Sequence, residues 1–353
     1  MWLPFILRIT PWFGIRIEDP NFLYIYRNFD GLLYVVAAKT LYNPSLIKDL
    51  HLESALEPIY FSAHFPLYPL LIRAVAGIFG YLKAMIVVNI ASTLLLVFFF
   101  HYLISKLKIT SHPLILSTIL LFLPRFLVIR SIGAPESLFI LFILVSLFLF
   151  EKEKYLWSAV AGSLAVATRS PGILLIPAYG LVFIERYIKK RSIDYRWLYM
   201  ILIPLTLLGI FLFYGKQYGD FFAYFNSGDN LHLEYPFAVF NYDARWVGTA
   251  WLEDAFFFFF FYLLTLFSFK KSRLRSFYYF IFVYFSAIVL IQHRDISRYS
   301  LPLWPFALIA FEKFFTSRKF LVALILLLPA IYMLAWNFMG HNVMPVSDWS
   351  AFR

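Results

Sequence analysis

The chain carries few polar groups that could do chemistry, and Asp30 is the first of them. It stands in the short polar segment 28–34 and is followed by Gly31. Because glycine adopts backbone angles that are closed to other residues, the Phe-Asp-Gly sequence at 29–31 predicts a tight turn that presents the Asp30 carboxylate. Capping a turn or a helix is the alternative interpretation, since aspartate is common there. A presented carboxylate could take a proton from a substrate hydroxyl.

Two arginines could supply positive charge for an anionic substrate. Arg169 lies in the segment 168–172 and Arg298 in the segment 292–299, each at a break between apolar runs. An arginine beside a membrane span is costly in lipid, so it usually faces a cavity or a partner. The pair could therefore grip a phosphate group. Alternatively, each side chain could reach out to the lipid headgroups.

Three further side chains accompany these residues in segments of mixed polarity, namely His64, Glu136 and Tyr299. Glu136 follows Pro135 at a predicted helix start, where an acidic side chain is often only a favourable partner of the helix dipole. We therefore predict supporting roles for all three, with the structural interpretation of Glu136 left open.

Metal or thiol chemistry is not predicted. His51, Glu53, Glu57 and His64 are close in sequence, but their spacing matches no established ligand pattern. The chain has no cysteine, which excludes disulfides and thiolate metal sites. No cofactor is expected, although a divalent metal would be compatible with the residues.

The elements that must position these residues are membrane helices. Of the 353 residues, 62% are hydrophobic and 14% are charged, and apolar runs such as 84–105, 197–214 and 320–338 approach the length that crosses a bilayer. The formal charge of +11 comes from lysines and arginines in short loops between these runs. Membrane topology explains that pattern, so nucleic-acid binding is not expected. The composition predicts an all-α, multi-pass membrane protein.

About 11 spans are predicted in a single domain, 1–353. The positive-inside rule places the basic loops and the amino terminus in the cytoplasm, and the carboxyl terminus outside. The first outer loop, 16–83, then holds Asp30 and a helix at 66–81 along the membrane interface, and a second large outer loop covers 215–250. The predicted spans are 1–15, 84–105, 113–130, 135–150, 155–169, 171–186, 196–214, 251–269, 276–291, 299–314 and 319–338.

Several of these segments together resemble one family. The Phe-Asp-Gly sequence at 29–31, His64-Phe-Pro-Leu-Tyr-Pro69, Pro135-Glu-Ser-Leu-Phe139, the Arg-Ser-Pro-Gly sequence from Arg169 and the Ser-Arg-Tyr sequence ending at Tyr299 occur in that order. The set resembles the PIG-V family, which comprises GPI mannosyltransferase II and its prokaryotic relatives among the GT-C glycosyltransferases. His64 stands where phenylalanine is usual, and Pro171 replaces an asparagine.

The resemblance implies a GT-C-like fold and an inverting glycosyltransferase. It implies mannose transfer from a polyprenyl- or dolichyl-phosphate donor to a glycan or glycolipid acceptor, on the extracytoplasmic side of the membrane. The compact length and the absence of cysteine indicate a prokaryotic relative in the cell membrane. In such a reaction Asp30 is the base, Arg298 and Arg169 contact the donor phosphate, and His64, Glu136 and Tyr299 support them.

Two alternatives stay open. A GT-C enzyme could transfer another lipid-linked sugar from the same kind of donor. A transporter or flippase for lipid-linked sugars would instead predict internal repeats and ionisable residues at mid-membrane. The sequence contains no Gly-rich phosphate loop and no evident repeat, and its polar residues gather on one predicted face. That pattern favours an enzyme that takes its activated substrate from the membrane.

Overall fold

The computed structural model describes residues 1–28, 30–53, 56–192, 194–228, 233–241, 252–293 and 295–352. These residues form helices and turns, and their β-structure is confined to isolated bridges. The prediction of an all-helical chain is therefore confirmed. A helix satisfies its backbone hydrogen bonds within one segment, which suits long apolar runs.

The longer helices are α3 (Gly31–Thr40), α5 (Leu67–Phe79), α6 (Tyr81–Lys106), α7 (Pro113–Phe122), α9 (Glu136–Glu151), α10 (Tyr155–Thr168), α11 (Leu175–Lys190), α12 (Leu202–Tyr218), α14 (Glu253–Phe269), α15 (Arg275–Val289) and α19 (Arg318–His341). Shorter α-helices are α1 (Leu3–Ile6), α2 (Leu23–Tyr26), α4 (Pro44–Asp49), α8 (Pro124–Ile129), α13 (Ala223–Asn226), α16 (Ile296–Tyr299), α17 (Trp304–Ala310) and α18 (Glu312–Phe315). The 3-10 turns are η1 (Pro58–Ala63), η2 (Ser170–Leu174), η3 (Tyr195–Ile201), η4 (Ala238–Phe240), η5 (Leu301–Leu303) and η6 (Ser350–Phe352).

Four helical stretches of the described chain are long and apolar enough to cross a membrane. They cover 81–106, 170–190, 195–218 and 318–341, and the last is the least buried within the protein. On α19, for example, Leu326 is 74% exposed and its neighbours Ile325 and Leu327 are also exposed. A continuous apolar helix surface of this kind is unusual in contact with water. The structure thus suggests a membrane protein.

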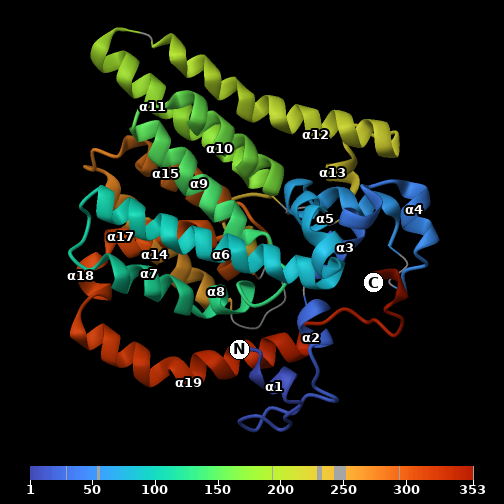
Figure 1. Ribbon diagram of the computed structural model, residues 1–353. Helices are drawn as coiled ribbons and strands as arrows, with labels where there is room; N and C mark the ends of the chain where they lie inside the picture. The colour runs from blue at the N-terminus through green and yellow to red at the C-terminus, as the bar shows by residue number, and fades with distance from the viewer. Residues whose placement is uncertain are drawn as a thin grey trace.

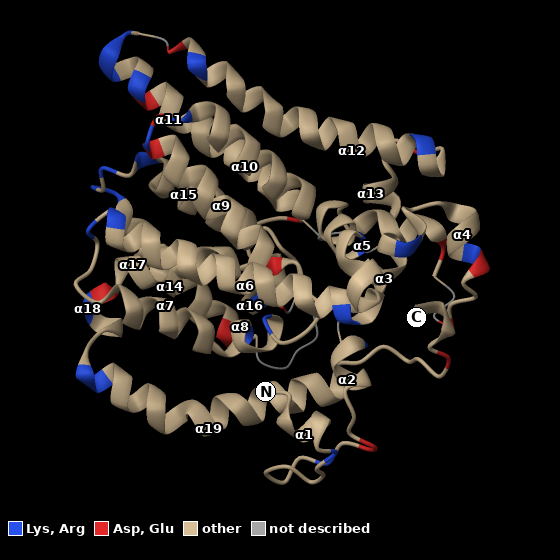
Figure 2. Ribbon diagram, in the orientation of Figure 1, with Lys and Arg blue, Asp and Glu red and all other residues tan. Residues whose placement is uncertain are grey.

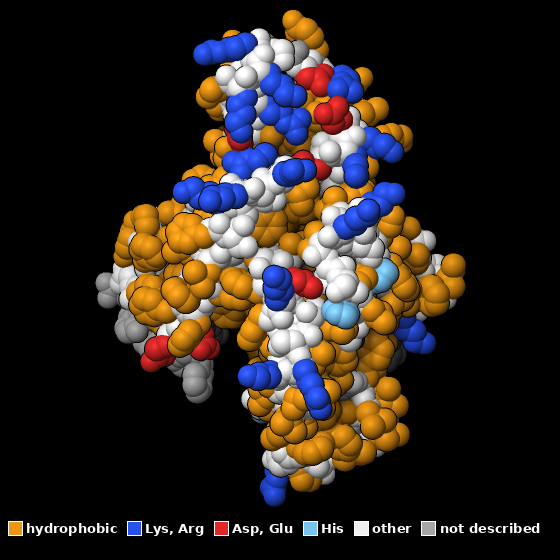
Figure 3. All heavy atoms as spheres, turned by 90° about the vertical axis from the view of Figure 1, so that its left-hand side faces the viewer, with side chains coloured by type: hydrophobic (Ala, Val, Ile, Leu, Met, Phe, Trp, Pro, Cys, Tyr) orange, Lys and Arg blue, Asp and Glu red, His pale blue; other side chains and the backbone are white. Residues whose placement is uncertain are grey.

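The basic loops lie together at one end of the helices. The connections that follow α6, α9, α11, α14 and α17 all reach the left-hand end of the view in Figure 1. Lysine and arginine residues gather at that end of the ribbon in Figure 2, and Figure 3 shows their side chains from that side. Helices α3, α4 and α5 lie at the opposite end. The alternation of charged loops along the sequence therefore corresponds to a separation in space.

The first predicted span is wrong. Only Leu3–Ile6 is helical in the stretch 1–15. Pro11 has no N–H to donate and Arg8 is costly in lipid, so a long apolar helix is disfavoured there. Instead, the Trp2 indole donates to the Ser131 carbonyl (2.8 Å), and the Trp336 indole donates to the Met1 carbonyl (2.9 Å). The amino terminus is thus not at the end that carries the basic loops.

Two other predicted spans are interrupted. The stretch 113–130 divides into α7 and α8, where Leu123 is extended and Pro124 begins the second helix. The stretch 299–314 contains a helical segment, 301–310, that ends at Phe311, where α18 follows. Proline favours an extended residue before it and cannot continue the hydrogen-bond ladder. These breaks leave irregular backbone close to the start of α9.

The helix predicted at 66–81 forms as α5 and leads directly into α6 through Gly80. Gly80 has a φ of 73°, which glycine adopts readily. Ile78 and Leu70 on α5 are exposed, as an interfacial helix requires. Tyr68 is not at the surface, because its hydroxyl is buried and donates to the Met85 carbonyl (2.9 Å). Helix α5 packs against both α3 and α6, and so holds the helix that follows Asp30.

Candidate active site

Three charged side chains meet where helices end opposite the basic loops. Glu136 is the first residue of α9, Arg169 directly follows α10, and Arg298 lies in the short helix α16. Helices α9 and α10 pack against each other along their length, so the start of one lies beside the end of the other. The sequence-predicted Glu136, Arg169 and Arg298 are therefore brought together.

Glu136 binds both arginines. Its Oε1 atom accepts from Arg169 Nη1 at 2.5 Å and from Arg298 Nε at 2.7 Å, and its side chain is 1% exposed. A buried carboxylate is tolerated only when it is paired, and removal of one partner typically costs about 3–5 kcal/mol. The interpretation of Glu136 as a mere dipole partner is thus too weak, because the side chain fixes two guanidinium groups.

Asp30 stands at the edge of this cluster and is not used as a helix cap. It occupies the N-cap position of α3, yet its side chain makes no capping hydrogen bond. Its Oδ2 atom lies 3.4 Å from both Nη1 and Nη2 of Arg298, and 36% of the side chain is exposed. Contacts of that length are weak hydrogen bonds. The carboxylate therefore has only weak contacts with Arg298 and opens into the adjacent cavity.

Gly31 is required for close packing rather than for a special backbone angle. Its N–H donates to the Asn28 carbonyl at 3.3 Å, so a turn leads into α3, and Gly31 begins that helix without a positive φ. Phe29 lies outside the described residues. A Cβ atom on Gly31 would lie 3.1 Å from Met85 Sδ and 3.2 Å from the Gly133 carbonyl oxygen. The same methionine fills the space at Gly133, where a Cβ atom would lie 2.2 Å from its Sδ. Glycine at both positions lets α3 approach the loop before α9.

A polar cavity of about 90 Å³ is lined by Asp30 and by both arginines, and His64 and Tyr299 also line it. His64 is buried, with its ring 4.7 Å from that of Tyr34, and burial lowers the pKa of His64 to about 4. The imidazole is accordingly neutral at pH 7 and adds no charge to the cavity. The cavity is lined by Asp30, Tyr34, Ala63, His64, Thr168, Arg169, Ser170, Pro171, Tyr224, Arg298 and Tyr299.

An apolar cavity of about 210 Å³ adjoins the polar one. The two cavities share Arg169, Arg298 and Tyr299, together with Ser170, Pro171 and Tyr224. Beyond these shared residues the second cavity is lined mainly by Ile173, Leu174, Leu207, Phe211, Phe225, Leu233, Ala287, Ile288 and Ile291. A charged wall on one side and an apolar wall on the other suit an amphipathic molecule with an anionic group at the junction.

Tyr224 was not singled out as a site residue from the sequence. It lies on α13 in the predicted outer loop 215–250, and its hydroxyl is 2.7 Å from the Ser170 hydroxyl. The cluster of aromatic residues beside acidic ones in that loop was the available signal, but the sequence equally fitted an interfacial loop. Much of that loop, at 229–232 and 242–250, lies outside the described residues.

The acidic residue nearest to Arg298 in sequence has a different partner. Asp295 forms an ion pair with Arg125 and is absent from the lining of both cavities. It also accepts from the Ser297 hydroxyl (3.1 Å). Asp295 therefore ties α16 to α8 and holds Arg298 in place indirectly. Within the described residues, no group of three or more histidine, aspartate or glutamate side chains is placed to hold a metal ion.

No protein-family model matches the chain, and neither a curated protein nor a solved structure matches it. The resemblance to the PIG-V family therefore stays a prediction from the sequence motifs.

Proposed function

We propose that the chain is an integral-membrane, inverting glycosyltransferase with a GT-C-like fold, related to the PIG-V family. It transfers mannose from a polyprenyl- or dolichyl-phosphate donor to a glycan or glycolipid acceptor. The observation that carries the proposal is the pairing of the two cavities. Asp30 opens into the polar one, and Arg169 and Arg298 stand at its junction with the apolar one.

The donor would bind across that junction. Its phosphate lies against Arg169 and Arg298, its sugar in the polar cavity beside Asp30, and the first part of its lipid chain against the apolar wall. The arginines suit this task because guanidinium groups present several donors to phosphate oxygens in a fixed geometry. Glu136 holds the two groups at a set separation and offsets part of their mutual repulsion.

The transfer needs one base and a stabilised leaving group. Asp30 accepts the proton of the acceptor hydroxyl as that oxygen forms a bond to the anomeric carbon. The bond between that carbon and the donor phosphate oxygen breaks, and both of its electrons leave with the lipid phosphate. Arg169 and Arg298 stabilise the charge that develops on the phosphate. The proton on Asp30 then passes to solvent, and the anomeric configuration is inverted.

The orientation of the protein follows from its basic end. The positive-inside rule assigns that end to the cytoplasm, so the cavities and the loops 16–83 and 215–250 face the extracytoplasmic side of a prokaryotic cell membrane. Without a first span, ten of the predicted crossings remain, and both chain ends lie outside. This placement supports a lipid-linked donor, because nucleotide sugars are cytoplasmic while lipid-linked sugars are reached from within the membrane.

The proposal is tested by incubating purified protein in detergent with radiolabelled polyprenyl-phosphate sugars and membrane extract. We expect label from the mannosyl donor in a glycan or glycolipid, and none with the Asp30→Asn variant. Label from a different sugar would keep the reaction class and change the donor. In proteoliposomes, movement of the donor to the other leaflet without a new glycosidic bond would contradict the proposal in favour of a transporter.

A further inference from the structure

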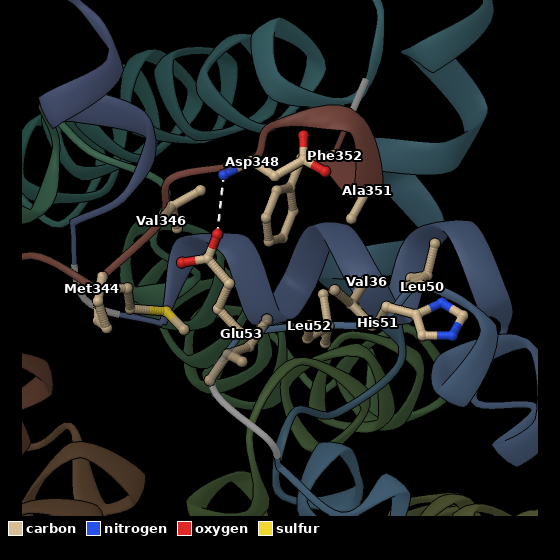
Figure 4. Close-up of a pocket in the computed structure, with 12 residues that line it drawn as sticks. Val36, Leu50, His51, Leu52, Glu53, Met344, Val346, Asp348, Ala351 and Phe352 are labelled. Carbon is tan, nitrogen blue, oxygen red and sulfur yellow. Dashed lines mark hydrogen bonds between the residues drawn. The ribbon is translucent and has the colours of Figure 1, made fainter.

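A segment near the end of the sequence lies across α3, the helix that begins directly after Asp30. We call residues 343–352 the strap. Figure 4 shows the strap residues Val346, Asp348 and Phe352 over α3 and the residues around Glu53. The space between them is only about 30 Å³, too small for a ligand. The contact between the strap and α3 therefore serves to hold α3 in place rather than to bind a ligand.

The strap and the helix before it grip the chain just upstream of Asp30. The buried Asn28 side chain donates to the Met339 carbonyl at 2.8 Å. Asn28 also forms a β-bridge with Val343, and the Met344 N–H donates to the Arg27 carbonyl at 2.9 Å. Asp30 follows Asn28 by two residues, so the contacts that hold Asn28 also restrict the backbone of Asp30.

The strap also grips the chain downstream of Asp30. Near the far end of α3, the Lys39 ammonium donates to the Ala351 carbonyl at 2.8 Å. Phe352 is buried and packs near Leu33 and Val36 on α3. The strap has no long helix of its own that would keep it in place. Its position depends on the side chains that bind it.

Glu53 is the residue that fastens the strap to the first loop. Its carboxylate accepts from the Ser347 N–H (2.9 Å), from the Asp348 N–H (2.8 Å) and from the Ser347 hydroxyl. Charge-assisted hydrogen bonds to backbone N–H groups are stronger than those between neutral groups. Two backbone N–H groups and one hydroxyl group donate to this one exposed side chain.

We propose that Glu53 and the strap position Asp30 for the reaction, which makes Glu53 a positioning residue. The inference rests on the proposed function. Asp30 makes no capping bond and touches Arg298 only at 3.4 Å, so its side-chain contacts do not fix it. The backbone on both sides of it must do so, and the strap holds both sides. A displacement of about 1 Å in a reacting group can lower a rate by about 10²-fold.

The test compares Glu53→Ala with Glu57→Ala, a matched exposed glutamate in the same loop that makes no side-chain cap to the helix it precedes. We expect Glu53→Ala to lower kcat by about 10-fold or more with little change in the donor KM. Hydrogen–deuterium exchange over residues 28–40 should become faster, while exchange over α9 and α10 should not. Glu57→Ala should leave all of these quantities at the wild-type values.

A covalent bridge between residue 53 and the strap tests whether the position of Asp30 causes the change in kcat. Because the chain has no cysteine, Glu53→Cys with Ser347→Cys can be bridged by a short bis-methanethiosulfonate reagent. We expect the bridge to restore kcat and slow exchange over 28–40, and reduction to reverse both. Faster exchange with unchanged kcat, unchanged exchange in Glu53→Ala, or a bridge that fails to restore kcat would overturn the positioning role alone. A wild-type protein with no transferase activity would overturn the proposed function as well.

Discussion

Arg298 holds Asp30 loosely and Glu136 tightly. Its Nη1 and Nη2 atoms lie 3.4 Å from Asp30 Oδ2, whereas its Nε atom lies 2.7 Å from Glu136 Oε1. The two carboxylates therefore differ in what they can do. Glu136 is buried and bound by two guanidinium groups, so it serves as an anchor. Asp30 keeps lone pairs free toward the cavity, as a base requires.

The first prediction concerns Asp30. Asp30→Asn keeps the shape of the side chain but cannot accept a proton at neutral pH. We expect turnover to fall by about 10²–10⁴-fold, while donor binding and the melting temperature stay near wild type. Stability should change by at most ~1 kcal/mol, because the side chain caps no helix. Turnover assays and thermal unfolding of the purified variant measure both quantities.

Asp19→Asn and Asp49→Asn, in the same loop, are the controls and should be mild. If Asp30→Asn keeps more than about a tenth of wild-type turnover, Asp30 is not the base. Asp295 and Glu136 would be poor replacements, since each is bound to arginine.

The second prediction separates the two roles of Arg298. Arg298→Ala should abolish donor binding and also lower stability by about 3 kcal/mol, because it leaves a buried carboxylate with one partner fewer. Adding Glu136→Gln removes the carboxylate that still pairs with Arg169, so it should lower stability further without recovering donor binding. A double-mutant cycle on thermal stability, with donor binding measured in parallel, tests this. Normal donor affinity in Arg298→Ala would make Arg298 purely structural.

The charged residues that the structure brings together could be named from the sequence, but their pairing could not. Asp30, Arg169 and Arg298 stood out because charge is rare in so apolar a chain. The ion pairs of Glu136, however, join positions 33 and 162 residues apart, and no local pattern encodes such contacts. The contribution of Tyr224 was hidden for a similar reason, because aromatic residues are common at membrane edges.

The helices were predictable where apolar runs were uninterrupted. They were not predictable where a proline or a charged residue disfavours a membrane helix. Long helices such as α6 and α19 followed from composition. The predicted first span was wrong because apolar content alone ignored Pro11 and Arg8. The strap could not be predicted at all, since residues 343–352 are held by Glu53 and Lys39, more than 290 residues away.

The third prediction concerns pH. The pKa of His64 is lowered from 6.5 to about 4 by burial, opposed by Asp30 and assisted by Arg298 and Arg169. The unfolded chain therefore binds a proton at His64 below pH 6.5, whereas the folded chain binds it only near pH 4. The contribution of His64 to the free energy of unfolding is fully present above pH 6.5. It is lost as the pH drops toward 4, and the loss amounts to about 3 kcal/mol.

His64→Phe should remove this loss, since phenylalanine does not titrate. Melting temperatures measured between pH 4 and pH 7.5 test the prediction. His112→Phe, which replaces an exposed histidine, should keep the wild-type pH dependence. Equal acid sensitivity in His64→Phe and wild type would show that His64 is not buried in the neutral form.

The fourth prediction concerns orientation. Single cysteines can be introduced cleanly into this cysteine-free chain, for example Ser45→Cys on α4 and Lys190→Cys at the basic end of α11. An impermeant maleimide should label the first in intact cells and the second only after permeabilisation. The reverse pattern would place the cavities in the cytoplasm and contradict a lipid-linked donor taken from the outer leaflet.

The last prediction concerns the apolar cavity. Ala287 on α15 lines it, whereas the neighbouring Ser286 is exposed on the same helix. Ala287→Trp would fill part of the cavity and exclude a few methylene groups of a lipid chain, each worth about 0.8 kcal/mol when buried. Two lost methylenes would correspond to about a 10-fold rise in the donor KM. We expect this rise with a long-chain polyprenyl-phosphate sugar and a much smaller one with a donor whose chain is too short to reach the wall. The kcat should change little, because the reacting atoms lie in the polar cavity.

Ser286→Trp, which adds the same bulk toward lipid, should leave both constants unchanged. An equal rise in KM for short and long donors in Ala287→Trp would mean that this cavity does not hold the lipid chain.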